Sequence, residues 1–300
     1  INMIYKILKI VFYIFKKNLI MKNYLLVFLL VNYFGLNAQI LTPQTSPRAQ
    51  FTQKVGLTTV EIDYSRPAVR GRKIMGNLVR YDEIWRTGAN KNTIISFSDP
   101  VQIEGNTLPA GQYGLYTRPS SNQWKVYFYK STNNWGLPNP WDDSEVALSL
   151  IITPSFFEYK IENFTITISD INSDAAQLNL IWENTLLSIP FEVPTKAKAM
   201  ESINETMAGN PKPNDYYNAA LYFLQENMDL NQAKNWMEIA IAKRDTPAFW
   251  MHYRYALILL ELNDNKGALT ASKKSLALAE KAENKDYVIL NKELIEKWSR

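Results

Sequence analysis

The chain has 300 residues, enough for two domains, and its 46% hydrophobic and 21% charged residues indicate a globular rather than a disordered protein. The absence of cysteine excludes disulfides, thiolate nucleophiles, cysteine-ligated zinc, iron–sulfur clusters and the lipid-modified cysteine of a bacterial lipoprotein. The first 38 residues carry five lysines and no acid, so the formal net charge of +4 becomes −1 for residues 39–300. Such a nearly neutral chain does not predict a nucleic-acid partner.

Residues 21–38 have the order of regions typical of a secretory signal peptide. Met21-Lys22-Asn23 is a short positive start, residues 24–34 are an apolar run, and the small residue Ala38 precedes the predicted cleavage. We predict a mature protein that begins at Gln39, has no transmembrane segment, and is exported to the periplasm or secreted as a soluble protein, not as a lipoprotein. Residues 1–20 carry four lysines among apolar residues, a poor pattern for a membrane span. We interpret them as upstream translation or a leader extension.

Residues 46–193 predict a β-rich domain. TTVEIDYS (58–65) alternates Val60, Ile62 and Tyr64 with polar residues. WKVYFYK (124–130) alternates Trp124, Val126 and Phe128 with a second face that holds Lys125, Tyr127 and Tyr129. Further runs rich in β-branched and aromatic residues are TIISFS, VQIEG, YGLYTR, VALSLIIT, KIENFTITIS, AQLNLIWE and LLSIPFEV, while GNTLPAGQYG indicates a turn and a strand entry. About nine short strands favour an antiparallel sandwich or open barrel.

Helical periodicity replaces the strand pattern after Pro194. Residues 194–213 predict a junction with at most one helix, and residues 214–300 a helical repeat domain. Two stretches align at an offset of 35 or 36 residues, which is typical of tetratricopeptide-like repeats. Small residues at Ala220, Ala233, Ala256 and Ala268 allow the helices to approach closely. The predicted fold class is therefore α+β in two domains, an antiparallel β-sandwich or open barrel followed by an all-α tetratricopeptide-like repeat.

The arginine segment, residues 66–86, holds five of the chain's ten arginines. Between Asp63 and Lys91, seven basic residues face only three acids. We expect Gly71 and Gly76 to let this segment fold back over the sheet, so that its arginines converge near Trp85. Guanidinium groups bind carboxylate or phosphate and stack on aromatic rings, which predicts an anionic or sugar-like ligand. The candidate ligand-binding residues are Arg66, Arg70, Arg72, Trp85, Arg86 and Asn90.

Two other interpretations of this segment stay open. In the first, its arginines are structural and pair with Asp63, Asp82 and Glu83. In the second, acids in or near the segment act in a hydrolase, because two carboxylates suffice for glycoside hydrolysis. These acids are Asp63, Asp82, Glu83, Asp99 and Glu104.

Several chemistries are disfavoured by the residues themselves. The only histidine, His252, lies in an aromatic-rich helical stretch, which favours a packing role. The β domain therefore lacks both residues from which catalytic Ser-His-Asp and Cys-His arrangements are built. We assign no catalytic residue, metal site or cofactor. NPWDDSE, with Asp142, Asp143 and Glu145, offers oxygen ligands for calcium, but it lacks the glycine and the regular alternation of a known calcium loop.

The run from Ser46 to Pro119 carries a resemblance to a known family. The motif YSRPxxxGRxIxGxLVxYxxxWRTGANxxT, followed by LPAGxYxLYT, resembles the family catalogued as domain of unknown function 2911, common in exported proteins of Bacteroidetes-like organisms. The resemblance covers residues 46–193, and family members often carry a helical repeat tail. It implies export and a β-rich domain but no activity. One departure is Arg80, where the family frequently has proline.

The aromatic residues of the helical tail have two readings. They either line a concave face for a peptide or protein partner, or they form the core of the repeats, which we favour for Trp236 and Trp250. The residues are Tyr216, Tyr217, Tyr222, Trp236, Trp250 and Tyr253. The sequence thus favours an exported, non-enzymatic binding module. The alternatives are a carboxylate-dependent hydrolase, such as a carbohydrate-active enzyme, and a structural envelope component without a small ligand.

Overall fold

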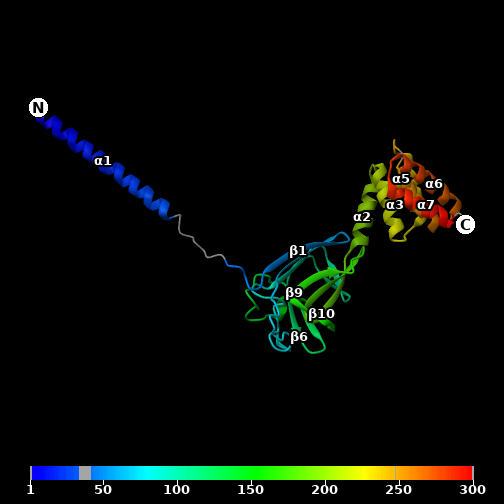
Figure 1. Ribbon diagram of the computed structural model, residues 1–300, viewed down its shortest axis with the longest axis horizontal. Coiled ribbons are helices and arrows are strands. Elements are labelled where there is room, and N and C mark those ends of the chain that lie inside the picture. The colour runs from blue at the N-terminus through cyan, green and yellow to red at the C-terminus, as the bar shows by residue number, and fades with distance from the viewer. Residues whose placement is uncertain (1, 34–41, 247, 299–300) are drawn as a thin grey trace. The chain divides into compact units, whose positions relative to one another are not determined.

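The computed structural model describes residues 2–33, 42–246 and 248–298 (Figure 1). The chain divides into two compact units, Ile1–Pro47 and Arg48–Arg300. Helix α1 (Asn2–Tyr33) belongs to the first unit and runs through the boundary that we predicted between residues 20 and 21. The predicted cleavage after Ala38 lies outside the described residues. No helix in the described part of the chain is long and apolar enough to cross a membrane.

Two antiparallel sheets make up the β-rich part of the second unit. The larger has the order β1 (Arg48–Val55), β2 (Thr58–Ser65), β3 (Thr93–Phe97), β6 (Gly111–Pro119), β7 (Trp124–Tyr129) and β8 (Val146–Ile152). The smaller has the order β5 (Asn106–Leu108), β4 (Val101–Ile103), β10 (Ala175–Glu192) and β9 (Ser155–Ser169). With the helices that follow, this arrangement confirms the predicted α+β class with a sandwich-like first part.

The hydrophobic core contains the predicted inward faces of the strands. The side chains of Val60, Ile62 and Tyr64 on β2 are buried, and so are Trp124, Val126 and Phe128 on β7. Tyr127 and Tyr129, which we placed on the second face of β7, are buried as well. The ring of Trp141 packs on them, with centroid distances of 5.3 and 4.6 Å. The alternation was therefore right, but the second face is covered by a loop.

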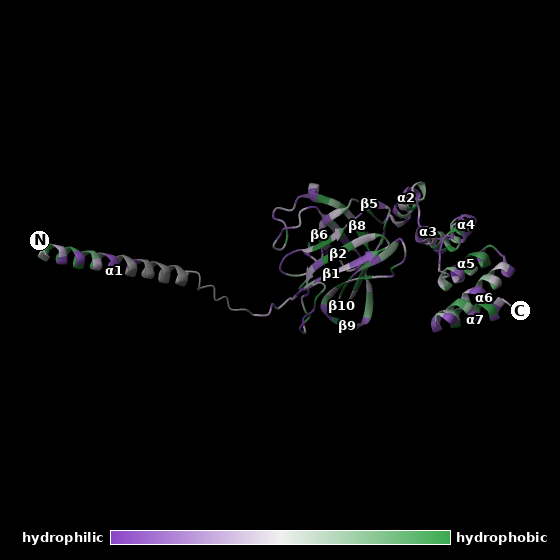
Figure 2. Ribbon diagram, turned by 90° about the horizontal axis from the view of Figure 1, so that it is seen from above, coloured by the Kyte–Doolittle hydropathy of each residue, from purple (hydrophilic) through white to green (hydrophobic). Residues whose placement is uncertain are grey.

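Three strands differ from the sequence prediction. β1 was not predicted, because its hydrophobic residues are few and its burial alternates between exposed and half-buried positions up to the buried Val55 at its end (Figure 2). β5 lies in the stretch that we expected to be a turn. AQLNLIWE and LLSIPFEV form the single strand β10, which keeps its pairing with β9 through register shifts around Glu183. Glu183 adopts φ 54°, so one bulged residue joins the two predicted strands.

Helices α2 (Thr195–Ala208), α3 (Pro213–Gln225), α4 (Leu230–Ala242), α5 (Phe249–Glu261), α6 (Asn265–Lys281) and α7 (Lys285–Trp298) follow the sheets. From α3 onward each helix packs against the next. Side chains of Asp229 and Asp264 cap α4 and α6 by accepting hydrogen bonds from Gln232 N and Gly267 N. The alanines expected at close helix contacts, Ala220, Ala233, Ala256 and Ala268, are all fully buried.

Aromatic and imidazole side chains of the helical part pack as predicted. Trp236 and Trp250 are half-buried and lie against the hydrophobic cluster of α3–α5. His252 is buried, and loss of solvation lowers its pKa to about 4, with a smaller contribution from Lys274. A histidine that is neutral and enclosed at physiological pH serves packing.

Helix α2 begins in close contact with the β1–β2 turn. Leu57 N donates a hydrogen bond to Thr195 Oγ1 at 3.3 Å, and Lys198 Nζ lies 2.5 Å from Asp99 Oδ1. Gly56 has φ 52°, and a Cβ added there would lie 1.9 Å from Thr195 Oγ1. Only glycine therefore fits this turn without displacing its neighbours.

Candidate functional site

The arginine segment is a long ordered loop between β2 and β3. Isolated bridges pair Ala68 with Asn163 of β9 and Trp85 with Thr117 of β6. The Trp85–Thr117 bridge uses two main-chain hydrogen bonds of 2.7 and 3.0 Å. Arg70 adopts a positive φ of 49°, and Gly71 follows with 70°, so the chain reverses there. The segment is thus attached to both sheets.

Its first residues cover part of the outer edge of β9. Phe164 N donates to Pro67 O, and Val69 N donates to Glu162 O, each at 2.8 Å. Because β9 is an edge strand of its sheet, these bonds satisfy main-chain groups that would otherwise be open to another chain.

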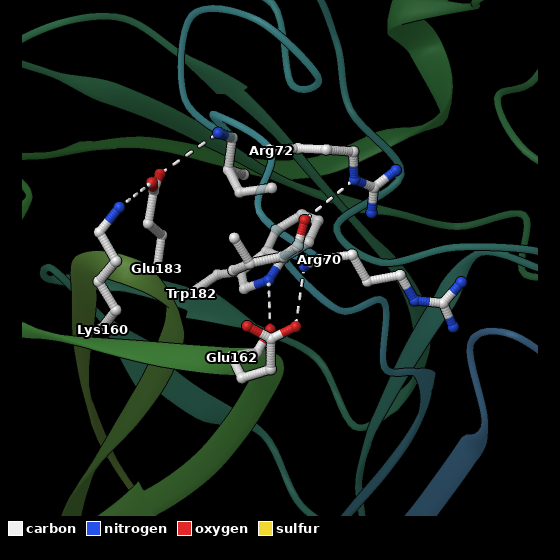
Figure 3. Close-up of polar contacts among 8 residues, drawn as sticks. Arg70, Arg72, Lys160, Glu162, Trp182 and Glu183 are labelled. Carbon is white, nitrogen blue, oxygen red and sulfur yellow. Dashed lines mark hydrogen bonds and ion pairs between the residues drawn. The ribbon is translucent and has the colours of Figure 1, made fainter.

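Two glutamates fix the next part of the segment (Figure 3). Glu162 Oε1 accepts a hydrogen bond from Arg70 N at 2.8 Å, and Glu183 Oε2 accepts one from Ile74 N at 3.3 Å. Lys160 Nζ lies 3.1 Å from Glu183 Oε1. Neither glutamate was among the acids that we predicted as partners. They lie 92 and 109 residues after the residues that they bond, and no local sequence signal connects them to the loop.

The first group of candidate residues, Arg66, Arg70 and Arg72, lies on the β9 side of the segment. Arg66 donates from Nε to Phe164 O at 3.0 Å and from Nη2 to Thr165 Oγ1 at 2.7 Å. Arg72 donates from Nε to Val69 O at 3.0 Å and from Nη2 to Ala68 O at 2.5 Å. Figure 3 shows the side chains of Arg70 and Arg72 extending to the same side, away from Glu183.

The second group, Arg86 and Asn90, lies against a different loop. Arg86 Nη1 donates to Asn90 O at 2.8 Å, and Asn90 Nδ2 lies 3.5 Å from Ser65 Oγ. The guanidinium of Arg86 also packs on Gly136, where an added Cβ would lie 3.3 Å from its Cζ.

The ring of Trp85 packs against the hydrophobic core. Its ring stacks on Trp182, with a centroid distance of 5.7 Å and an interplanar angle of 20°, and meets Phe164 edge-on at 5.1 Å. Its Nε1 donates to Gly88 O at 3.0 Å. The structure therefore brings Arg66, Arg70 and Arg72 together and Arg86 with Asn90, while the Trp85 ring packs against the core.

The charges of three arginines have no acidic counterpart. Within residues 42–246 and 248–298, Arg66, Arg72 and Arg86 have no carboxylate within 4.0 Å. The acids predicted as their partners are used elsewhere or are not in contact. Asp63 pairs with Arg48, whose hydrogen bonds hold the pKa of Asp63 below its usual value. A guanidinium bonded to a neutral carbonyl satisfies its N–H groups but keeps its charge.

A groove of about 480 Å³ lies on the outer face of β1, β2, β3 and β6. Its polar lining consists of amide, hydroxyl and carboxylate side chains, namely Gln50, Thr52, Glu61, Asp63, Ser96 and Gln112. Glu61 and Asp63 are two residues apart on β2 and point to the same face, so their side chains start about 7 Å apart. Asp63 was on the list of candidate acids, but the groove itself was not predicted.

Asp142 and Asp143 of NPWDDSE, considered above for calcium binding, accept hydrogen bonds within a turn. Asp142 Oδ1 accepts a hydrogen bond from Ser144 N, and Asp143 Oδ1 accepts one from Trp141 Nε1, both at 2.9 Å. Among the described residues, no group of three or more histidines or acids is placed to hold a metal ion.

Comparison with known proteins bears on the β-rich part of the chain alone. Residues 46–191 match the model of a family described as Protein of unknown function (DUF2911). The match supports the resemblance given by the arginine segment and the LPAG turn, and it spans the two sheets. No curated protein matches the chain. No solved structure matches it either.

Proposed function

We propose that the protein is exported and that residues 46–193 form a ligand-binding module without catalytic activity. The ligand is an anionic small molecule or an anionic sugar, bound on the arginine segment. Residues 214–300 are a tetratricopeptide-like tail that contacts a peptide or protein partner. The family match is consistent with a β-rich module of this kind and assigns it no activity.

One observation carries the ligand proposal. Arg66, Arg72 and Arg86 donate hydrogen bonds to neutral acceptors, so three positive charges stay uncompensated by acids within the described residues. Arg72 is exposed, and Arg66 and Arg86 are half-buried. Partly desolvated guanidinium groups attract carboxylate, phosphate or sulfate more strongly than fully hydrated ones. The loop on which they sit is ordered by its own bonds, so little entropy is lost on binding.

The test is a thermal-shift series on purified residues 39–300 with phosphate, sulfate and glucuronate, and with glucose as the neutral control. Ionic strength is held constant with sodium chloride. We expect a saturable rise of the melting temperature with an anion and none with glucose, because a ligand that binds only the folded state stabilises it.

Single variants show which of the two arginine groups binds the ligand. Arg72→Gln tests the β9 side and Arg86→Gln the Gly136 side, and one of them should abolish the shift. Arg80→Gln is the matched control, because Arg80 lies in the same segment but pairs with Glu83 at 3.4 Å. A flat series for the wild type, or equal shifts in all variants, would favour the purely structural alternative.

The groove on the outer sheet face favours one second candidate, a carbohydrate-active hydrolase. Glu61 and Asp63 face the same hollow at a separation compatible with a pair of glycosidase carboxylates. Its test is hydrolysis of a panel of chromogenic glycosides by the wild type and by Glu61→Gln. Turnover that Glu61→Gln removes would establish the enzyme, and absence of turnover would leave the binding module.

A further inference from the structure

Trp135, in the loop between β7 and β8, holds its ring in solvent. It is the most exposed large hydrophobic residue in residues 42–246 and 248–298, at 77%, and Leu137 beside it is 43% exposed. Exposure alone does not define a site, because single apolar residues are common on protein surfaces. Trp135 differs from such residues in two respects, the way its backbone is held and the charge that lies beside it.

The backbone is fixed on both sides of Trp135. Before it, Asn92 N donates to Asn134 O at 3.1 Å, and Asn134 N donates to Asn92 Oδ1 at 3.0 Å. The side chain of Asn134 also donates to the hydroxyl of Tyr116 at 3.3 Å. After it, Gly136 is buried and adopts φ 96°. The exposed indole is therefore carried by a held loop, so a ligand that binds there orders little of the backbone.

Gly136 connects this loop to Arg86 of the arginine segment. A Cβ added at Gly136 would lie 3.3 Å from both Cζ and Nη1 of Arg86, so the loop lies directly on the guanidinium. Within the described residues no carboxylate lies within 4.0 Å of Arg86. The Cα atoms of Trp135 and Gly136 are about 3.8 Å apart. An exposed ring and an uncompensated positive charge are thus carried by adjacent points of one surface.

The two segments that meet here are basic and rich in amides. Residues 84–93 and 130–140 contain Arg86, Lys91 and Lys130 but no acid. Asn133 and Asn139 are exposed on the same loop as Trp135. Amide side chains donate and accept hydrogen bonds, as the hydroxyl groups of a sugar do. The surface therefore combines a flat apolar ring, a cation and amide groups, and its charge favours an anionic occupant.

We propose that Trp135 and Arg86 bind a uronic acid residue of an acidic glycan. The indole stacks on the C–H face of the sugar ring, and the guanidinium pairs with the sugar carboxylate. A tryptophan supplies a large contact area with few rotatable bonds, and an arginine matches the planar carboxylate. The inference rests on the proposed ligand-binding role of the arginine segment. It assigns the ligand to the Arg86 side and names its chemical class.

Three probes separate the ring from the charge. Trigalacturonate carries both, its methyl ester keeps the rings and loses the charges, and inorganic phosphate is an anion without a ring. Binding to residues 39–300 is measured by isothermal titration calorimetry at constant ionic strength. We expect trigalacturonate to bind at least about tenfold more tightly than either of the other probes, because it alone uses both contacts.

Variants then assign the two contacts. Trp135→Ala should weaken trigalacturonate binding at least about tenfold and leave the weaker phosphate binding unchanged, and Trp135→Phe should retain part of the affinity. Arg86→Gln should remove the preference for the acid over its ester. Tyr159→Ala is the matched control, because Tyr159 on β9 is an aromatic residue that is also largely exposed, at 63%, and it should behave as the wild type.

The outcomes distinguish this inference from the proposed function. If phosphate binds and trigalacturonate binds no more tightly, or if Trp135→Ala binds trigalacturonate as the wild type does, the inference fails and the anion-binding role stands. Equal affinity for the acid and its ester also overturns it, because Arg86 then pairs with no carboxylate. If no probe binds, both proposals fail.

The melting temperature and the oligomeric state test the remaining roles of the ring. Trp135→Ala should melt at the wild-type temperature, because an exposed side chain contributes little to folding. A lower melting temperature would make the ring part of the fold and overturn the inference. Sedimentation that shows a wild-type dimer, and a monomer for Trp135→Ala, would assign the ring to a protein contact and overturn it as well.

Discussion

The arginine side chains of the arginine segment and of the helical tail differ in the hydrogen-bond acceptors that the fold gives them. In the segment, Arg66 and Arg72 find main-chain carbonyl oxygens within 3.0 Å. Among the described residues of the tail, the buried Nε of Arg254 has no hydrogen-bond acceptor, and the guanidinium bonds only the side chain of Tyr217. The difference follows from the backbone around them. Loops and edge strands have carbonyl groups without a main-chain hydrogen-bond partner, whereas the carbonyl groups inside a helix already accept main-chain hydrogen bonds. An arginine on a loop therefore bonds main-chain carbonyl groups, whereas one inside a helical layer depends on side chains of the neighbouring helices.

The largest effect is expected at Gly56, where the β1–β2 turn meets the start of α2. Gly56→Ala should lower the free energy of unfolding by about 3 kcal/mol or more, because it combines a left-handed backbone with overlap against Thr195 and Ser173. Urea denaturation measures the loss. Gly105→Ala is the matched control, with φ 72° and nothing within 4 Å of the added Cβ, and should cost only about 1 kcal/mol. Equal losses would mean that the close approach of α2 to the turn is absent in solution.

The comparison itself is tested by removing one arginine from each region. Arg66→Met should lower the free energy of unfolding by about 2 kcal/mol, because it deprives Phe164 O and Thr165 Oγ1 of their donors. Arg254→Met should cause a smaller loss, because it removes only the bond to Tyr217 and a buried Nε that has no acceptor. Chemical denaturation of both variants under one set of conditions gives the answer, and similar losses would refute the contrast drawn between loop and helix.

A pH titration tests whether His252 of the tail is buried in its neutral form. The folded-state pKa of His252 is about 4 and its unfolded value about 6.5, so the unfolded chain binds more protons between these two values. Stability should therefore fall by about 1–2 kcal/mol as the pH drops from 7 to 5. Asp63 and Asp99, whose pKa values are lowered from 3.8, act below this window. His252→Gln should remove the slope, and an unchanged slope would assign it to other groups.

The smallest effect is expected for the arginine of the segment that does pair with an acid. Arg80 and Glu83 lie 3.4 Å apart with both side chains largely exposed. Solvent and salt screen such a pair, so Arg80→Gln should change the free energy of unfolding by less than about 0.5 kcal/mol. A loss as large as that of Arg66→Met would show that formal charge pairing, rather than carbonyl bonding, fastens the segment.

Much of the β architecture could be predicted from the sequence, because the alternation of a strand depends on neighbouring residues. The period of two on β2 and β7 correctly identified the core faces. The same rule could not show that Tyr127 and Tyr129 are covered, since Trp141 reaches them from a loop. It also divided β10 in two, because a single bulged residue at Glu183 interrupts the alternation. Local patterns report which residues alternate, and they do not report what lies above them.

The candidate site was predicted in composition but not in arrangement. The clustering of arginines, the turn at Gly71 and the ordered loop all follow from adjacent residues. The acceptors do not, because Glu162 and Phe164 belong to a strand about a hundred residues further along. Trp135 did carry a sequence signal that we did not use, a tryptophan next to Gly136 in a stretch without acids, residues 130–140.

The order of hydrophobic and polar residues alone determined most of the strands, the helices and the change from one to the other after Pro194, because these depend on neighbours within a turn or a strand pair. Only the tertiary structure decided which charges are matched. Whether a guanidinium meets a carbonyl, a carboxylate or nothing depends on segments that the folded chain brings together from distant positions. For that reason the arginine segment bonds to strands of both sheets, while Arg254 in the tail keeps a buried Nε without an acceptor among the described residues.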